Sequence, residues 1–175
     1  MFRIISRATA AIALMAALGA CYITGASVIP AERAEAIPGI EGAWLPADNS
    51  TTDTLNVAQK PGSMDYALTS SAPDAQGQTL TARGYLLAGS TYVVQMWDEA
   101  SLQDGVVLVF LTIDGDDISI LGVTSDQQAL ASQAGVTLAE DNVTLDGDAG
   151  LLLNFIELHK NAQFTPPTPM LKRVS

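Results

Sequence analysis

The stretch that decides the fold is "GVVLVFLTIDGDDISILGV", residues 105–123. It opens with an uninterrupted run of β-branched, aliphatic and aromatic residues over 105–113, reaches the polar turn "DGDD", and then becomes apolar again. Two apolar runs joined by a turn that contains Asp-Gly indicate a β-hairpin, and we expect a type I′ turn at Asp114-Gly115. The chain is therefore expected to be built on antiparallel strands.

Similar short apolar segments precede this hairpin, and turn residues separate each from the next. In "MDYALTS", residues 64–70, the side chains of Met64, Tyr66 and Leu68 share one face, which is typical of a half-buried strand. The pattern predicts an antiparallel meander, with strands over residues 40–46, 54–58, 64–70, 79–87, 90–97, 105–113 and 118–123, and a short strand or extended link over residues 136–145.

Two short helices are expected after the hairpin. In "TSDQQALASQAG", residues 124–135, Ser125 is the expected N-cap, Gln128 is its capping-box partner, and Gly135 ends the helix. Residues 146–162 begin with acidic side chains and end with basic ones, the order that a helix dipole favours. We expect this second helix to pack on a barrel wall or over its mouth.

About eight strand-like segments with one or two short helices predict a mainly β fold, an antiparallel up-and-down barrel over residues 39–165. Such a barrel is either filled by its own side chains or holds one small ligand, and the sequence leaves both open. Residues 166–175 are expected to form a flexible Pro-rich tail, because proline is excluded from central strands. For a hollow barrel, the predicted lining residues are Leu80, Leu86, Val94, Leu108 and Phe110.

Residues 1–20 have the features of a secretory signal peptide. Arg3 and Arg7 give a positive start, and an uncharged, mostly apolar run over 8–20 ends in small residues. That run is too short to cross a hydrocarbon core about 30 Å thick as a helix. Its last residues together with the next, "LGAC" at 18–21, resemble a bacterial lipobox.

The lipobox resemblance implies that a diacylglyceryl group is attached to the sulfur of Cys21, and that cleavage leaves Cys21 as the first residue of the mature chain. The alternative is an ordinary signal peptide with a buried or incidental cysteine. Cys21 is the only cysteine of the chain, so no internal disulfide is expected. Residues 21–38 are expected to be a tether between lipid and barrel. Tyr22 stands where an aspartate would retain a lipoprotein in the inner membrane, which favours the periplasmic face of the outer membrane.

The charge of the chain excludes two modes of binding. The formal net charge is −11 at pH 7, and removal of residues 1–20 makes it more negative because they contain two arginines and no acidic residue. Nucleic acid is excluded because its phosphates would be repelled. Adhesion to anionic headgroups through basic residues is excluded for the same reason. The membrane is therefore expected as a partner through the lipid anchor alone.

The sequence offers little catalytic chemistry. His159 is the only histidine, and no nucleophile elbow accompanies it, so we expect it to be structural or exposed. Zinc sites need several Cys or His ligands. An EF-hand loop that begins at Asp114 would need a glutamate where Ser125 stands. No enzymatic activity, metal or cofactor is expected.

Two features resemble the lipocalin-like bacterial lipoproteins, a family of largely unknown function. "GAW", residues 42–44, matches the G-x-W at the start of the first lipocalin strand, and the order of segments between Tyr66 and Phe164 is similar. The resemblance implies that Trp44 packs across one end of the barrel, beneath an arginine of the last strand. No predicted strand supplies that arginine, because Arg173 lies beyond the prolines.

The sequence therefore predicts a lipid-anchored protein of the cell envelope with a lipocalin-like barrel. The barrel is expected to bind a small apolar ligand or to serve as a non-catalytic accessory. The alternative is a protein-binding module, an inhibitor or assembly factor that uses an acidic exposed loop such as "WDEASLQD", residues 97–104, to bind another envelope protein.

Overall fold

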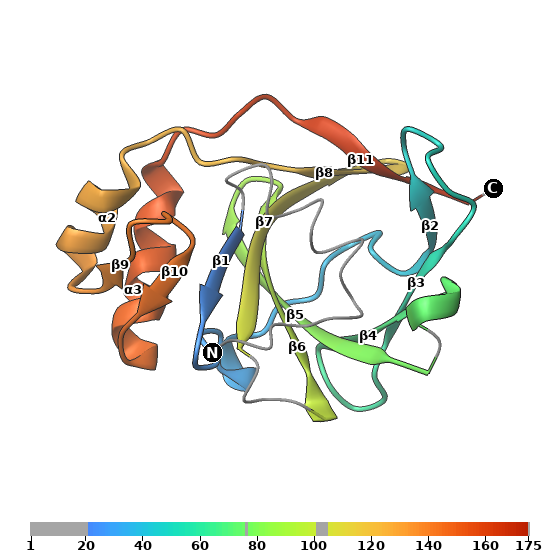
Figure 1. The fold of residues 1–175 in the computed structure, drawn as a ribbon, viewed down its shortest axis with the longest axis horizontal. Coiled ribbons are helices and arrows are strands. Elements are labelled where there is room, and N and C mark those ends of the chain that lie inside the picture. The colour runs from blue at the N-terminus through green and yellow to red at the C-terminus, as the bar shows by residue number, and fades with distance from the viewer. Residues whose placement is uncertain (1–20, 76, 101–104, 175) are drawn as a thin grey trace.

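The computed structural model describes residues 21–75, 77–100 and 105–174 (Figure 1). Its centre is a closed antiparallel barrel in which the strands follow the order β6-β5-β4-β3-β2-β11-β8-β7 and the pairing of β6 with β7 completes the ring. The predicted mainly β, up-and-down barrel is confirmed. Its strands are β2 (Gly42–Pro46), β3 (Leu55–Gln59), β4 (Asp65–Ser70), β5 (Thr79–Ala88), β6 (Thr91–Asp98), β7 (Val106–Asp114), β8 (Asp117–Ile120) and β11 (Thr168–Arg173).

The hairpin predicted from residues 105–123 is formed by β7 and β8, with Asp114 opposite Asp117. The loop residues are Gly115 and Asp116, and of these two only Gly115 has a positive φ, 59°. Glycine at the first loop position is the type II′ arrangement, so the predicted type I′ turn is wrong. Both turns match the right-handed twist of the flanking strands, which is why the hairpin itself forms as expected.

The C-terminal segment completes the barrel. β11 pairs with β8 on one side and with β2 on the other, and Figure 1 shows it running beside β8. The prediction of a flexible tail over 166–175 is therefore wrong. The register of the β8–β11 pairing shifts between Pro169 and Leu171, and such a bulge is where a strand tolerates a residue that lacks a backbone N–H. Leu171 gives the strand an apolar contact with the barrel core.

The predicted tether over 21–38 is also wrong, because these residues pack on the barrel. β1 (Cys21–Thr24) pairs antiparallel with β7 and parallel with β10 (Thr144–Asp146). Val28 and Ile29 are buried, and both backbone N–H groups donate to the Gln95 side-chain oxygen, at 2.6 and 2.8 Å. A short 3₁₀ turn, η1 (Ala31–Arg33), follows.

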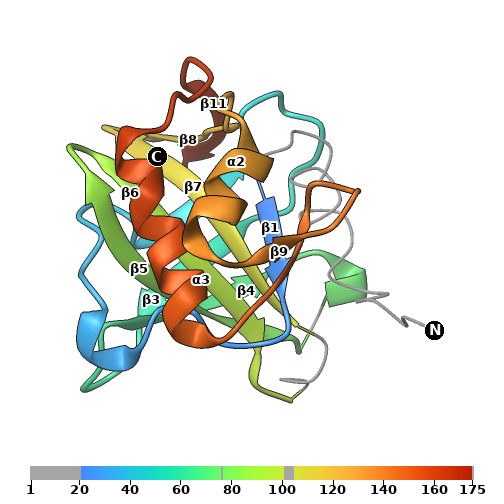
Figure 2. The same cartoon turned by 90° about the vertical axis from the view of Figure 1, so that its left-hand side faces the viewer.

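A helical layer covers one outer face of the barrel (Figure 2). It contains α2 (Gln127–Ala134), β9 (Thr137–Leu138), β10, α3 (Ala149–Leu158) and the 3₁₀ turn η4 (His159–Asn161); a further 3₁₀ turn, η2 (Pro73–Ala75), follows β4. The N-cap of α2 is Asp126, whose side chain accepts from the Ala129 N–H, so the predicted Ser125 cap is wrong by one residue. Among the described residues, no helix is both long and apolar enough to cross a bilayer.

The barrel wall separates two buried clusters. The inner cluster lies inside the barrel and consists of Cys21, Ile37, Ile40, Trp44, Val57, Tyr66, Ala82, Val94, Met96, Val107, Val109, Leu111 and Ile118. The outer cluster lies between the barrel wall and the helical layer, and its large side chains include Tyr22, Tyr85, Leu108, Phe110, Leu152, Phe155 and Ile156. Strand alternation creates both clusters, because successive side chains of β7 point to opposite faces of the wall.

Candidate binding site

One end of the barrel is closed by the segment between β1 and β2. We call residues 28–41 the strap, and Figure 1 shows the strap crossing from η1 to β2. Ile37 and Ile40 are 3% and 5% exposed and belong to the inner cluster. The Ile37 N–H donates to the Tyr66 hydroxyl at 2.9 Å, and the Glu35 N–H donates to the Gly84 carbonyl at 2.9 Å. The strap therefore seals this end with apolar side chains and satisfied backbone groups.

Glycine at position 84 is required by the close approach of the strap. A Cβ atom there would lie 2.5 Å from Ile37 Cγ1 and 3.1 Å from the Glu35 carbonyl oxygen. We expect Gly84→Ala to lower the free energy of unfolding by about 1–3 kcal/mol, the usual cost of overpacking a core. Gly25→Ala is the matched control, because no atom lies within 4 Å of a Cβ there. Urea unfolding of both variants checks this, and equal effects at the two positions would contradict it.

Trp44 and Arg173 hold the strap end together. Trp44 is fully buried, and its indole N–H donates to the Ile40 carbonyl at 2.8 Å. The Arg173 guanidinium carbon lies 4.4 Å from the centre of the Trp44 ring, within the range of a cation–π contact. Arg173 also donates to the carbonyls of Glu41, at 2.7 Å, and Gly39. Trp44 thus packs at the barrel end as predicted, and its arginine partner is Arg173, which the sequence pattern does not place in a strand.

The glycine of "GAW" has a direct structural cause. Gly42 has a φ of +133°, and a Cβ there would lie 2.5 Å from Arg173 Nη1. A signal for Arg173 does exist in the sequence: it stands two residues after Leu171, so that both side chains share one face if the segment is a strand. The nearby prolines favour an irregular segment over a strand, so this spacing does not by itself predict the position of Arg173.

The opposite end of the barrel, which we call the far end, is less tightly filled by the residues described. Leu55, Leu68 and Leu80 lie near the strand ends there and are all half-buried. Leu68 pairs with Val57 on one side and with Leu80 on the other, so the leucines form a continuous apolar surface on the interior face. Ile120 and Leu171 are half-buried as well and also contact the inner cluster. Residues 76 and 101–104, in two of the connections at this end, are not among the described residues.

The structure places three of the five predicted lining residues on the interior face. Val94 belongs to the inner cluster, and Leu80 and Leu86 share the face of Ala82 in β5. Leu108 and Phe110 are predicted wrongly, because they belong to the outer cluster beneath the helices. The β7 run is apolar on both faces, since the barrel core lies on one side and the helical layer on the other. Alternation of polarity, the usual signal for the inward face, is therefore absent.

Cys21 is seated in the barrel wall. It lies opposite Val109, its side chain belongs to the inner cluster, and it is 5% exposed. Burial raises the pKa of the Cys21 thiol to about 12. The sulfur is therefore protonated and shielded in this conformation, whereas a lipid acceptor needs an accessible thiolate. The predicted signal peptide, residues 1–20, lies outside the described residues.

His159 is a buried structural histidine at the centre of the outer cluster. Its Nδ1 lies 2.8 Å from the Phe155 carbonyl oxygen, and its Nε2 lies 3.2 Å from the Tyr22 hydroxyl. The carbonyl can only accept, so Nδ1 carries the proton and Nε2 accepts from Tyr22. The ring stacks on Phe110 with centroids 4.9 Å apart. This environment gives His159 a packing role in the outer cluster.

We expect the stability of the fold to fall as the pH drops below about 6.5, the ordinary pKa of histidine. Burial lowers the pKa of His159, while its hydrogen bond to Phe155 opposes the shift. Between the lowered pKa and the ordinary one, the unfolded chain binds a proton that the folded chain does not, so the free energy of unfolding decreases there as the pH falls. Urea unfolding at several values between pH 8 and 5 measures this slope. A His159→Gln variant should lose it, and an unchanged slope would contradict the assignment.

The acidic loop proposed for protein binding is partly held against the barrel. Glu99 accepts from the Lys60 ammonium and from the Thr81 hydroxyl, the latter at 2.9 Å, and these contacts hold the pKa of its carboxyl below the usual range. The Arg83 guanidinium carbon lies 5.2 Å from the Trp97 ring centre. The rest of that prediction, residues 101–104, lies outside the described residues.

Within the described ranges, no group of three or more His, Cys, Asp or Glu side chains is placed to hold a metal ion. Comparison with known proteins adds no relative: no family model matches the chain, and no curated protein or solved structure does so either.

Proposed function

We propose that this protein is a non-catalytic, lipid-anchored barrel of the bacterial cell envelope that takes a small apolar ligand at its far end. The observation that carries this proposal is the difference between the two ends. The strap end is filled by Ile37, Ile40 and the fully buried Trp44, whereas the far end presents the half-buried leucines. An eight-stranded barrel has room for its own side chains or for one small ligand. An end lined by half-buried leucines suits a small apolar ligand.

The proposed family is that of the lipocalin-like bacterial lipoproteins. Its support is the G-x-W segment at the start of β2 and the arginine of β11, the last strand of the barrel, over the tryptophan ring. Both residues fix the strap, so they define which end is closed.

The proposed anchor is a diacylglyceryl group on Cys21, supported by "LGAC" at 18–21. The sulfur forms a thioether to the glyceryl carbon of a membrane phospholipid, whose phosphate headgroup leaves with the thiol proton. Water then hydrolyses the peptide bond between Ala20 and Cys21 in a peptidase. The chain would be held at the periplasmic face of the outer membrane, because Tyr22 is not the aspartate that retains such proteins in the inner membrane.

The ligand proposal is tested with the mature chain, residues 21–175, which contains the whole described fold. We expect N-phenyl-1-naphthylamine, an apolar probe whose fluorescence rises in apolar surroundings, to bind the wild-type chain. Leu68→Gln should weaken binding by about tenfold, or about 1.4 kcal/mol, because it places an amide on the apolar surface. The matched control is Leu151→Gln on α3, where the leucine is exposed. Thermal unfolding confirms that both variants are folded.

Two results would contradict the ligand proposal. One is a wild-type chain that binds no probe, which would favour a filled barrel serving as a scaffold for protein binding. The other is equal binding by the Leu68 and Leu151 variants, which would place the probe away from the far end.

A further inference from the structure

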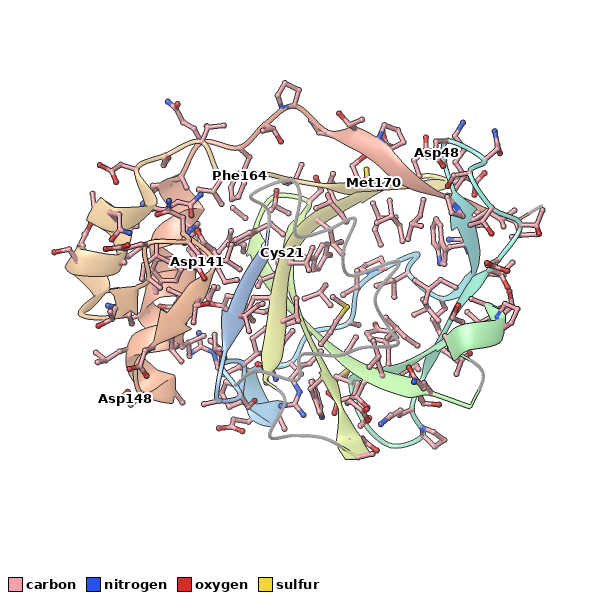
Figure 3. The ribbon with its side chains drawn as sticks, viewed as in Figure 1. Cys21, Asp48, Asp141, Asp148, Phe164 and Met170 are labelled. Carbon is pink, nitrogen blue, oxygen red and sulfur yellow. The ribbon has the colours of Figure 1, made fainter. Side chains whose placement is uncertain are left out.

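Docking of β1 on the barrel and attachment of the proposed lipid both involve the Cys21 sulfur. Figure 3 shows Cys21 at the barrel wall, beside β7. The neighbouring side chains in β1 alternate: Cys21 faces the inner cluster and Tyr22 faces the outer one. Tyr22 is 1% exposed, and its ring contacts Phe110 and Phe155 with centroids 6.0 and 5.1 Å away. Docking of β1 therefore buries the very sulfur on which the anchor is proposed.

A diacylglyceryl group cannot be accommodated at this sulfur while β1 is docked. The side chain is 5% exposed and is packed among buried residues of the inner cluster. Even a few added methylenes strain a packed core by about 1–3 kcal/mol, and two acyl chains add far more. Cys21 therefore cannot be buried in the inner cluster and acylated at the same time.

Resting on the proposed acylation, we infer that β1 is an exchangeable strand, docked between β7 and β10 in the unmodified chain and released from that seat when Cys21 carries its lipid. The barrel survives the release, because β1 is not one of the strands that close the ring. Residues 25–27 are exposed, and a Cβ at Gly25 would meet no atom within 4 Å. The first fixed point after β1 is Gln95, whose side-chain N–H donates to the Ser27 hydroxyl at 2.8 Å and whose side-chain oxygen accepts from the Val28 and Ile29 N–H groups.

Release converts residues 21–26 into the tether between lipid and domain, because Ser27 stays bonded to Gln95. Six extended residues span at most about 22 Å, enough to hold the barrel clear of the headgroups. The acylated form therefore has a shorter tether than residues 21–38, and the strap stays in place. The seat of β1, lined by β7 and β10, becomes accessible, and the Tyr22 hydroxyl no longer donates to His159.

His159 reports on this exchange because it is the only histidine in the chain. With β1 docked it is buried, and burial holds its pKa below the ordinary value. Once Tyr22 leaves, the ring gains contact with water, and its pKa should return toward about 6.5. Two other titratable groups near this end of α3, Glu157 and Lys160, bind the Tyr85 hydroxyl.

The test compares two forms of the protein in the same detergent: the protein purified from bacterial membranes after expression of the full chain, and the mature chain 21–175 made without lipid. Intact-mass measurement first establishes whether Cys21 is acylated. Nuclear magnetic resonance then gives the His159 pKa, and hydrogen exchange follows the Ile23 amide, which donates to the Val143 carbonyl at 2.9 Å in the docked state. Amides of the β4–β5 pairing serve as the internal control.

We expect the acylated form to exchange the Ile23 amide at least about 100-fold faster and to titrate His159 near its ordinary pKa, with the β4–β5 amides unchanged. An acylated form with a protected Ile23 amide and a lowered His159 pKa would overturn the exchange of β1 while leaving the anchor standing. Absence of acyl mass on Cys21 would overturn the anchor and, with it, this inference. Tyr22→Ala in the lipid-free chain should shift His159 in the direction of the acylated form.

Discussion

Trp44→Ala should lower the free energy of unfolding by about 3–5 kcal/mol, the range for removal of a fully buried large aromatic side chain. The side chain is 0% exposed, it belongs to the inner cluster, and its indole N–H satisfies the Ile40 carbonyl. Its removal also leaves the Arg173 guanidinium without the ring that it covers. The loss should therefore loosen the strap as well as create a cavity.

The chain contains its own control for this prediction, because Trp97 also lies beneath an arginine, Arg83. Trp97 is half-buried on the outer side of the wall, so Trp97→Ala should cost much less than Trp44→Ala. Chemical unfolding of both variants gives the comparison, and hydrogen exchange at Ile37 reports on the strap. Equal losses for the two tryptophans would contradict the role given to Trp44 at the closed end.

Gln95→Leu should cost about 2–6 kcal/mol although the two side chains are similar in size, because two buried donors lose their acceptor and each costs about 1–3 kcal/mol. The side-chain oxygen of Gln95 accepts from the backbone N–H groups of both Val28 and Ile29. Gln95 is 1% exposed, so water cannot readily replace the lost acceptor. The strap should therefore detach from the barrel at Val28 and Ile29.

Gln59→Leu is the matched control, because the Gln59 side chain is exposed and donates only to the Ser63 carbonyl and the Met64 sulfur. Urea unfolding should show a difference of more than about 1.5 kcal/mol between the two variants. Faster exchange at the Val28 and Ile29 amides should accompany the loss in Gln95→Leu. Similar stabilities for the two variants would mean that the strap is held elsewhere.

The barrel was predictable because its central strands carry local signals. The β7–β8 hairpin has long apolar runs and an Asp-Gly turn, and β4 alternates in polarity along its length. These signals depend on residues close in sequence, so no knowledge of the partner strand is needed. The turn type was not predictable, because it depends on which residue of "DGDD" takes the first loop position.

The two terminal strands were missed for a different reason. β1 is four residues long, and β11 contains Pro169, so neither carries a local strand pattern. Their stability comes from partners far away in sequence: β7 and β10 for β1, and β2 and β8 for β11. Local sequence patterns contain no information about such distant pairings. For this reason residues 21–38 were predicted as a tether and residues 166–175 as a flexible tail.

The candidate site was predictable only in part. Val94, Leu80 and Leu86 were assigned to the interior face, but the two-sided apolar character of β7 hid the outward direction of Leu108 and Phe110. Trp44 was recognised from "GAW", whereas Arg173 required knowledge that its segment is a strand. The burial of Cys21 could not be predicted because it depends on the pairing of β1 with β7 and β10, which are distant in sequence.

The most direct test of the account is the mass of the protein purified from bacterial envelopes, measured in native and in denaturing conditions. The account predicts a covalent diacylglyceryl addition on Cys21 that persists after denaturation, together with a second, apolar mass that is present in the native state and lost on unfolding. A native mass equal to the denatured mass would contradict ligand binding by the barrel, and a chain without the covalent addition would contradict the anchor.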